Sequence, residues 1–245
     1  MISKGGLLNR FHIIYSIAMC SNYLPAPKAK ITKHFGVVPP DNEFKPEAYP
    51  GYLAPIIRLN HDKPEELECV PACFGMVPAW ADLKLSKHTY NARTETVGSK
   101  PSFRHAYQKR QFAIIPADAI YEPNYETGKA VRWKISLGND APLGIAGIWE
   151  YRSNGPDGQP LISFSMLTIN ADDHPLMQRF HKPEDEKRMV VILRPDEYES
   201  WLHAPGEQIT SFLTQFPADE LAARAAPKPS AKKAAKPSSS PASLF

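Results

Sequence analysis

The sequence has 245 residues, of which 42% are hydrophobic, 10% aromatic and 22% charged, so it can bury a core as one domain. No apolar run reaches the length of about eighteen residues that a membrane-spanning helix requires, which excludes such a helix. Three cysteines (Cys20, Cys69 and Cys73) are too few for a disulfide scaffold and indicate a reducing, cytoplasmic compartment.

The formal net charge of +3 is unevenly distributed along the chain. Residues 224–245 hold five basic and no acidic side chains, whereas residues 19–223 hold 22 basic against 26 acidic side chains. The bulk charge of the core therefore does not favour nucleic acid. Binding to nucleic acid would depend on a local basic patch or on the C-terminal residues.

Residues 1–18 start with a basic, apolar stretch, but Arg10 and His12 interrupt its apolar run. Export as a lipoprotein would require a small residue where Met19 stands. We therefore expect residues 1–18 to be a removable leader or an upstream mis-start. Translation from Met19, followed by removal of that methionine, would leave Cys20 at the N-terminus.

The region between the ends is predicted to be one α+β domain, rich in β-structure, over residues 19–221. Short β-branched or aromatic runs separated by turn signals predict antiparallel strands at 111–117, 132–137, 143–151, 162–169 and 189–193. Short helices are expected within 175–181, 195–202 and 207–216. Residues 222–245, rich in Ala, Lys, Pro and Ser, have no periodic apolar face and are predicted to be disordered.

Cys20 is a candidate nucleophile. An N-terminal cysteine carries an α-amine and a thiol on adjacent carbons, with ordinary pKa values of roughly 8 and 8.5. Such a 1,2-aminothiol can attack an acyl carbon, or condense with an aldehyde as an imine and then close a thiazolidine ring. The alternative is that Cys20 is a small buried residue on a strand.

Four further residues have suitable chemistry. Glu122 ends an apolar run and could have a raised pKa, or could point to water. His181 lies between a predicted helix and a strand, where it could serve as a general acid–base or could be a surface histidine. Asn91 and Arg93 supply an amide and a planar phosphate-binding fork, or belong to a polar loop.

Cys69 and Cys73 lack a second ligand pair, so neither a metal nor a cofactor is expected.

The motifs resemble those of the SOS response-associated peptidase (SRAP) family, also called abasic site processing proteins. The matching stretches are Met19-Cys20, FGMVPAW (74–80), NARTET (91–96), FRHAYQKRQFAIIPADAIYEP (103–123), GIAGIWE (144–150), SMLTINADD (165–173) and HKPEDEKRMVVIL (181–193). Their common order makes the resemblance specific, and it covers most of residues 19–203.

The resemblance implies a compact, barrel-like domain with flanking helices, which binds single-stranded DNA and forms a thiazolidine crosslink with abasic sites. The catalytic residues of the family correspond to Cys20, Asn91, Glu122 and His181. The DNA-binding positions correspond to Arg93 and Trp80, with Asn22 where the family has a phosphate-holding arginine. We add Arg104 and Arg110 from the basic cluster RHAYQKR. The peptidase activity implies removal of the residues before Cys20.

Several expectations stay open. The family usually has Gly-Arg where this chain has Ser21 and Asn22, which indicates weaker DNA binding. The alternatives are a cysteine amidase or peptidase with an N-terminal nucleophile acting on acyl substrates, and a noncatalytic DNA-binding relic. The ending Ser243-Leu244-Phe245 looks like a sliding-clamp docking motif, although a solubilising tail also explains it. We expect a monomer in the bacterial cytoplasm, associated with the nucleoid after DNA damage.

Overall fold

The computed structural model describes residues 21–155 and 158–228. The strands are β1 (Tyr23–Pro25), β2 (Leu53–Leu59), β3 (Leu67–Phe74), β4 (Asn91–Arg93), β5 (Phe112–Asn124), β6 (Val131–Leu137), β7 (Leu143–Arg152), β8 (Leu161–Asn170), β9 (Arg188–Val190), β10 (Ile192–Leu193) and β11 (Leu221–Ala225). The α-helices are α1 (Lys28–Phe35), α2 (Arg104–Gln108) and α3 (Tyr198–Leu202). Short 3₁₀ helices are η1 (Leu83–His88), η3 (Met177–Arg179), η4 (Pro195–Glu197), η5 (Gly206–Phe212) and η6 (Ala218–Glu220).

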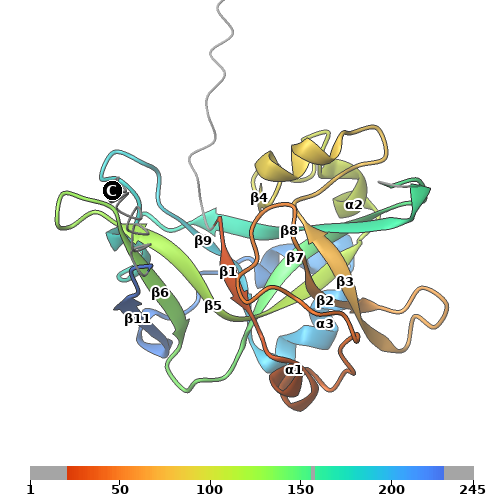
Figure 1. The fold of residues 1–245 in the computed structure, drawn as a ribbon, viewed down its shortest axis with the longest axis horizontal. Helices are drawn as coiled ribbons and strands as arrows, with labels where there is room; N and C mark the ends of the chain where they lie inside the picture. Colours follow the sequence, from red (N-terminus) through yellow and green to blue (C-terminus); the bar gives the residue numbers. More distant parts are fainter. Residues whose placement is uncertain (1–20, 156–157, 229–245) are drawn as a thin grey trace, which may run out of the picture.

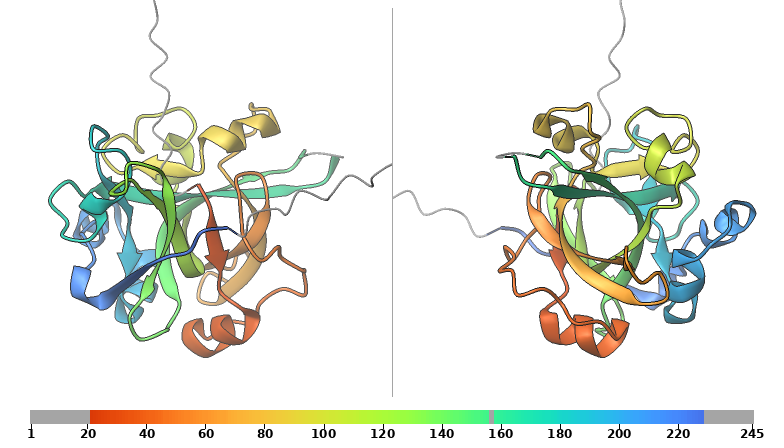
Figure 2. Two further views of the ribbon diagram at one scale, coloured as in Figure 1. Left: turned by 60° about the vertical axis from the view of Figure 1, so that its left-hand side comes forward. Right: turned by 90° about the vertical axis from the view of Figure 1, so that its right-hand side faces the viewer.

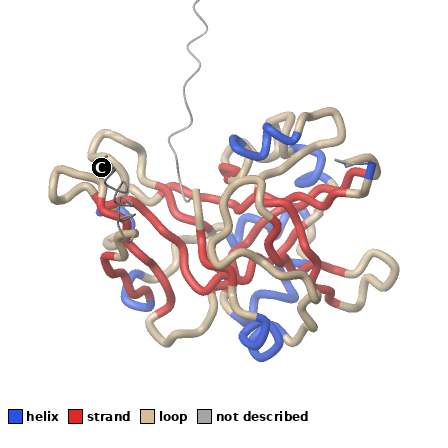
Figure 3. Tube along the Cα trace, viewed as in Figure 1, coloured by secondary structure: helices blue, strands red, loops and turns tan. Residues whose placement is uncertain are grey.

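Five strands close into a barrel in the order β7, β8, β3, β2 and β5, because β5 pairs with both β2 and β7. All neighbours in the barrel are antiparallel except β3 and β8. Strands dominate the fold and the helices lie at its periphery (Figure 3). The α+β, β-rich and barrel-like architecture predicted from the sequence is confirmed.

The long strand β5 connects the barrel to a second group of strands. Its first half, from Phe112 to Ala117, pairs with β7 in the barrel. Its second half, from Ile120 to Asn124, pairs with β6, and β6 in turn pairs with β11. Figure 1 shows β6 and β11 on the left of the molecule, away from β2 and β3, and Figure 2 shows the same fold from two further directions. The end of β5 therefore lies outside the barrel, where it can carry a site.

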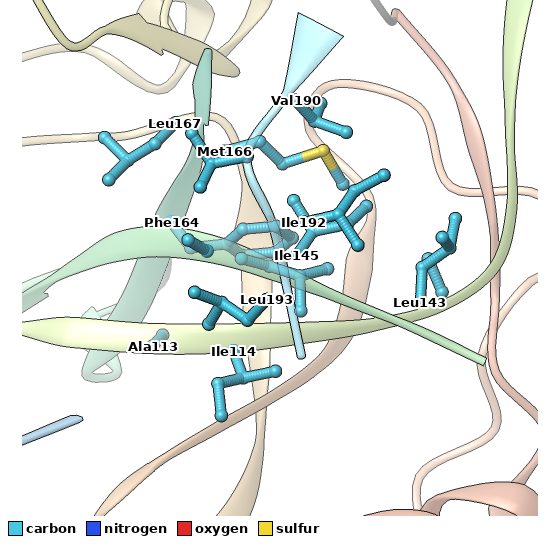
Figure 4. Packing of buried hydrophobic residues seen from close by; sticks show 14 of the residues in the cluster. Ala113, Ile114, Leu143, Ile145, Phe164, Met166, Leu167, Val190, Ile192 and Leu193 are labelled. Atoms are coloured by element: carbon cyan, nitrogen blue, oxygen red, sulfur yellow. The ribbon is translucent and has the colours of Figure 1, made fainter. Parts of the chain in front are cut away.

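The core fills the barrel with aliphatic and aromatic side chains from facing strands (Figure 4). Ile114, Ile145, Phe164 and Met166 are each at most 1% exposed. Full burial of one such side chain contributes roughly 1.5–3 kcal/mol to folding. Trp201 of α3 is also buried, and its indole N–H donates to the carbonyl of Ala113 at 3.0 Å. This contact fixes α3 against β5.

The expected strands all occur, and two details differ from the prediction. The run 189–193 is divided at Val191, because β9 pairs with β8 whereas β10 pairs with β7. In 175–181 only the 3₁₀ helix η3 forms. The other two helical segments contain η4 followed by α3, and η5.

The prediction that disorder begins at residue 222 is wrong for the first residues of that segment. Leu221–Ala225 forms β11, which pairs with β6 from Leu221 opposite Leu137 to Ala225 opposite Trp133. Leu221 and Ala223 share one face of the strand and pack against the core. The segment lacks a periodic apolar face, but its backbone hydrogen bonds to the edge of β6 hold it in place. The remaining tail from residue 229, with the predicted clamp motif, and the predicted leader lie outside the described residues.

Within the described part of the chain, no helix has the length and apolar character needed to cross a membrane.

Candidate functional site

Glu122 and His181 meet at the end of β5. Glu122 stands opposite Trp133 of β6, and the backbone N–H of His181 donates to the carbonyl of Pro123 at 2.7 Å. The imidazole Nε2 lies 3.1 Å from the Glu122 Oε2, and both side chains are 3% exposed. The separation is that of an ion pair rather than of a well-aligned hydrogen bond. The structure thus brings together two residues that the sequence separates widely.

The backbone of His181 adopts an uncommon conformation. Its φ angle is +62°, in the left-handed region that residues other than glycine seldom adopt. The hydrogen bond to Pro123 and the bridge between Phe180 and Asn124 hold it there. Such backbone strain concentrates at functional sites, where surrounding contacts maintain it. The strained residue here carries the imidazole of the candidate site.

The surroundings of His181 favour its protonated form. Burial lowers the pKa of the imidazole, but the contact with Glu122 and its negative charge outweigh burial, so the net pKa is raised above 6.5. Lys187 lowers the pKa and Asp185 raises it, each to a smaller extent. The pair can therefore hold a proton near neutral pH and exchange it with a substrate atom.

A small pocket of about 240 Å³ lies beside this pair. It is lined by Ser21, Asn22, Tyr121, Glu122, Pro123, Ala130 and Arg132. Cys20 lies outside the described residues and immediately precedes Ser21 in the chain. The described chain therefore begins at a pocket that Glu122 also lines.

Asn22 is buried at this pocket. Its backbone carbonyl accepts a hydrogen bond from the N–H of Tyr121 at 3.3 Å, and its side-chain amide donates to Glu47 at 3.1 Å. Glu47 also accepts from the hydroxyl of Tyr49 at 2.8 Å and forms an ion pair with Arg132 at 2.7 Å. The pKa of Glu47 is lowered, since Arg132 and Tyr49 outweigh its burial. A DNA contact by Asn22 stays a prediction.

Asn91 and Arg93 lie on β4, two residues apart and hence on one face of the strand. Both polar atoms of the Asn91 amide are buried without a hydrogen-bond partner among the described residues. Arg93 contacts Glu186 at 2.6 Å, and Glu186 contacts Arg188 at 2.8 Å. Burial raises the pKa of Glu186, but its hydrogen bonds from both arginines prevail and the net pKa is lowered. The proposed phosphate-binding fork is therefore held by a carboxylate in this structure.

The remaining predicted DNA-binding residues lie elsewhere. Trp80 is 67% exposed and lines a different pocket, of about 420 Å³, together with Arg104. Arg110 is exposed after the end of α2, with a φ angle of +54°. These side chains are accessible, but they do not line the pocket of Glu122.

Burial removes the two described cysteines, Cys69 and Cys73, from consideration as nucleophiles. It raises the pKa of the Cys69 thiol to about 12 and that of the Cys73 thiol to about 11. Because the thiolate is the reactive species, both side chains are inert near neutral pH.

Sequence reasoning missed Arg132, Glu47 and Arg188, which surround the predicted residues. Arg132 lies within a strand pattern and Glu47 in a loop without a recognisable motif. Arg188 is 2% exposed and makes a two-point contact with Glu95 at 2.7 and 2.8 Å. A basic residue at the start of a predicted apolar strand was the available signal for Arg188. The other two residues carried none.

Comparisons with known proteins identify the family and several relatives of this chain. The model of the SOS response associated peptidase (SRAP) family matches residues 19–229. The abasic site processing protein YoqW of Bacillus subtilis is 32% identical over 155 residues, 61% of this chain and 65% of YoqW. The abasic site processing protein HMCES of Mus musculus is 27% identical over 135 residues, 42% of this chain and 37% of HMCES. The matches thus span less than two thirds of these relatives.

Solved structures share the fold. A protein from Bordetella bronchiseptica matches with a TM-score of 0.78 and 40% identity, over 84% of this chain and 99% of that chain. A protein from Bacteroides thetaiotaomicron matches with a TM-score of 0.71 and 22% identity, over 84% of this chain and 91% of that chain.

Proposed function

The chain belongs to the SOS response associated peptidase family, as its motifs predicted, and we propose that it processes abasic sites in DNA. Its substrate is single-stranded DNA, and its product is a covalent thiazolidine crosslink through Cys20. The observation that carries the proposal is the buried Glu122–His181 pair beside a pocket lined by Ser21 and Asn22.

The reaction requires a free α-amine on Cys20, so hydrolysis of the peptide bond after Met19 comes first. The amine adds to the aldehyde carbon of the opened abasic sugar and expels water, which gives an imine. The thiolate then adds to the imine carbon and the nitrogen takes up a proton, which closes the ring. The product contains the cleaved protein plus the DNA minus one water.

The neighbouring side chains have distinct tasks. His181 and Glu122 move the protons needed to open the sugar and to dehydrate the carbinolamine. The amide of Asn91, which has no hydrogen-bond partner within residues 21–155 and 158–228, orients the sugar or the backbone next to Cys20. Arg93 holds a phosphate after exchanging Glu186 for it, and Trp80 offers an exposed indole for base stacking.

Intact mass spectrometry tests the proposal directly. The purified chain is weighed alone and after incubation with a single-stranded oligonucleotide that contains one abasic site. We expect loss of residues 1–19 and a heat-stable adduct with the mass of protein plus DNA minus water. Cys20→Ala should give no adduct, and Glu122→Gln should slow adduct formation by about 100-fold.

Acetylation of the new N-terminus separates the crosslinking activity from amidase chemistry. An amidase needs the thiol and a base, whereas the thiazolidine needs the amine as well. We expect acetylation to abolish the adduct. An adduct that survives acetylation, or one that Cys20→Ala still forms, would refute the thiazolidine mechanism.

A further inference from the structure

We infer that Arg132 binds the phosphodiester next to the abasic sugar, which makes it a DNA-contacting residue of the candidate site. The inference deepens the proposed function and rests on it. Arg132 lies on β6 opposite Pro123, the residue that follows Glu122 on β5. Among the described residues that line the pocket, Arg132 is the cation and Glu122 the anion.

The guanidinium of Arg132 is held in a fixed plane. It lies over the ring of Tyr121, with its central carbon 3.3 Å from the ring centroid. Its Nη2 lies 2.7 Å from the Oε1 of Glu47. Stacking on one face and an ion pair at one edge leave the group little freedom to rotate. A preorganised fork of this kind loses less entropy when it binds an anion.

Glu47 neutralises the positive charge of Arg132 only in part, because its carboxylate also accepts hydrogen bonds from other residues. The other oxygen of Glu47 accepts from Asn22 and Tyr49, and Lys228 adds a positive charge by donating to the Tyr49 hydroxyl at 2.5 Å. The Nε of Arg132 is buried without a hydrogen-bond acceptor among the described residues, whereas its Nη2 has the ion pair with Glu47. The side chain as a whole stays 19% exposed, so an incoming anionic oxygen can reach the guanidinium and form charge-assisted hydrogen bonds with it.

The ligand follows from the position of the pocket. Each nucleotide sugar has a phosphodiester on either side, so a sugar placed against Glu122 brings a phosphate to the same small pocket. Asn22 contributes only a neutral amide there, and that amide already donates to Glu47. Arg132 thus supplies the cation that a phosphate requires, and the contact is independent of base sequence.

The test measures binding without chemistry. The probe is a single-stranded oligonucleotide with a tetrahydrofuran abasic analogue, which has no aldehyde, titrated between about 50 and about 200 mM salt. Arg132→Gln should weaken binding by about tenfold. It should also reduce the slope of log affinity against log salt by about 0.7, the value for one single-strand phosphate. Arg132→Lys should keep the slope and bind about threefold more weakly, because it lacks the fork.

Arg194→Gln is a matched control. Arg194 also forms an ion pair at 2.7 Å, with Glu220, and also lies near an aromatic ring, that of Phe216, but outside this pocket. It should leave affinity and slope unchanged. If Arg132→Gln does not fold, the double variant Arg132→Gln/Glu47→Gln removes the unpaired carboxylate and is measured instead.

The outcomes separate the two proposals. The role of Arg132 is overturned if Arg132→Gln has the same salt slope as the wild type. It is also overturned if Arg194→Gln loses as much affinity as Arg132→Gln does. Binding with the expected slopes but no covalent product from a true abasic site overturns the crosslink alone, and leaves Arg132 as a phosphate contact. A wild type that neither binds nor crosslinks overturns both.

Discussion

The raised pKa of His181 makes the stability of the fold depend on pH. The folded pKa is raised above 6.5 because the Glu122 contact outweighs burial. The charged imidazole therefore stabilises the fold fully below about pH 6.5, and this contribution is lost as pH rises through the folded pKa. We predict that His181→Gln lowers the free energy of unfolding most at acidic pH, with a difference that shrinks as pH rises.

Denaturant unfolding from about pH 5.5 to about pH 9 measures this difference, and NMR titration of the imidazole measures the pKa directly. His203→Gln is the control, since His203 is exposed and its Nδ1 lies 3.0 Å from the backbone carbonyl of Glu199. A destabilisation by His181→Gln that grows with pH would contradict the prediction.

The carboxylate of Glu186 competes for the guanidinium of Arg93. The two groups are 2.6 Å apart and both are partly exposed. An exposed ion pair contributes about 0–1 kcal/mol. Competition from Glu186 therefore lowers the affinity of Arg93 for a phosphate by at most about fivefold. Glu186→Gln should therefore increase affinity for single-stranded DNA by up to about fivefold.

The measurement is an equilibrium titration with an undamaged single-stranded oligonucleotide. Glu66→Gln removes the same charge from an exposed pair with Lys63 in the β2–β3 loop, so it corrects for the change in net charge. Equal gains in the two variants would mean that the charge acts at long range and that Arg93 is not the phosphate contact.

Sequence motifs could identify the candidate site residues but not the contacts that hold them in place. Glu122 ends an apolar run and His181 precedes a strand, and both were named from those positions. Their contact depends on β5 leaving the barrel and on the left-handed turn at His181, which no local pattern encodes. Arg132 and Glu47 interact across elements distant in sequence, so their pairing appears only once the chain is folded.

The strand β5 has one half in the barrel and a second half that carries the candidate site. The buried residues of its first half are fixed by β2 and β7, whereas Glu122 in its second half depends on β6. The strand β6 is covered in turn by β11. The candidate site therefore depends on a strand close to the C-terminal end of the described chain.

This dependence predicts the effect of truncation. A chain ending at residue 221 loses most of β11, exposes the edge of β6 and removes the packing of Ala223. We expect it to melt several degrees lower and to crosslink more slowly, since the strand that faces Glu122 is no longer held on both sides. A chain ending at residue 228 keeps β11 and should melt as the full chain does.

Thermal melts and crosslinking rates of the two truncated chains provide the comparison. Equal melting temperatures would show that β11 is dispensable and that the domain ends at 221, as composition alone had predicted.

The barrel strands β2 and β3 were not predicted, whereas the run 111–117 was predicted although it contains Pro116. Both β2 and β3 contain a proline, which normally argues against a strand inside a sheet. In the structure Pro55 and Pro71 stand opposite each other. Two residues without an N–H can face each other at a position where the ladder needs no hydrogen bond between them. The strands with uninterrupted apolar patterns, such as β7 and β8, could be predicted because burial alone defines them.

The formal net charge of the full chain resides in its C-terminal residues. Residues 229–245 contain Lys232, Lys233 and Lys236 and no acidic side chain, which equals the formal net charge of +3 for the full chain. Without residues 229–245, the formal charges of the remaining side chains sum to zero. Attraction to DNA would then depend on local cations such as Arg132 and Arg104, rather than on net charge.

We therefore predict that a chain ending at residue 228 binds single-stranded DNA more weakly at low salt. Three lysines account for a reduction of up to about 2 in the slope of log affinity against log salt. The final yield of crosslinked product at saturating DNA should not change, because the pocket of Glu122 is intact. The same truncated chain with three lysines appended after residue 228 is the control and should restore the slope. If the slope of the truncated chain equals that of the full chain, the phosphate contacts all lie on the described domain, and the basic C-terminal residues have no part in holding DNA.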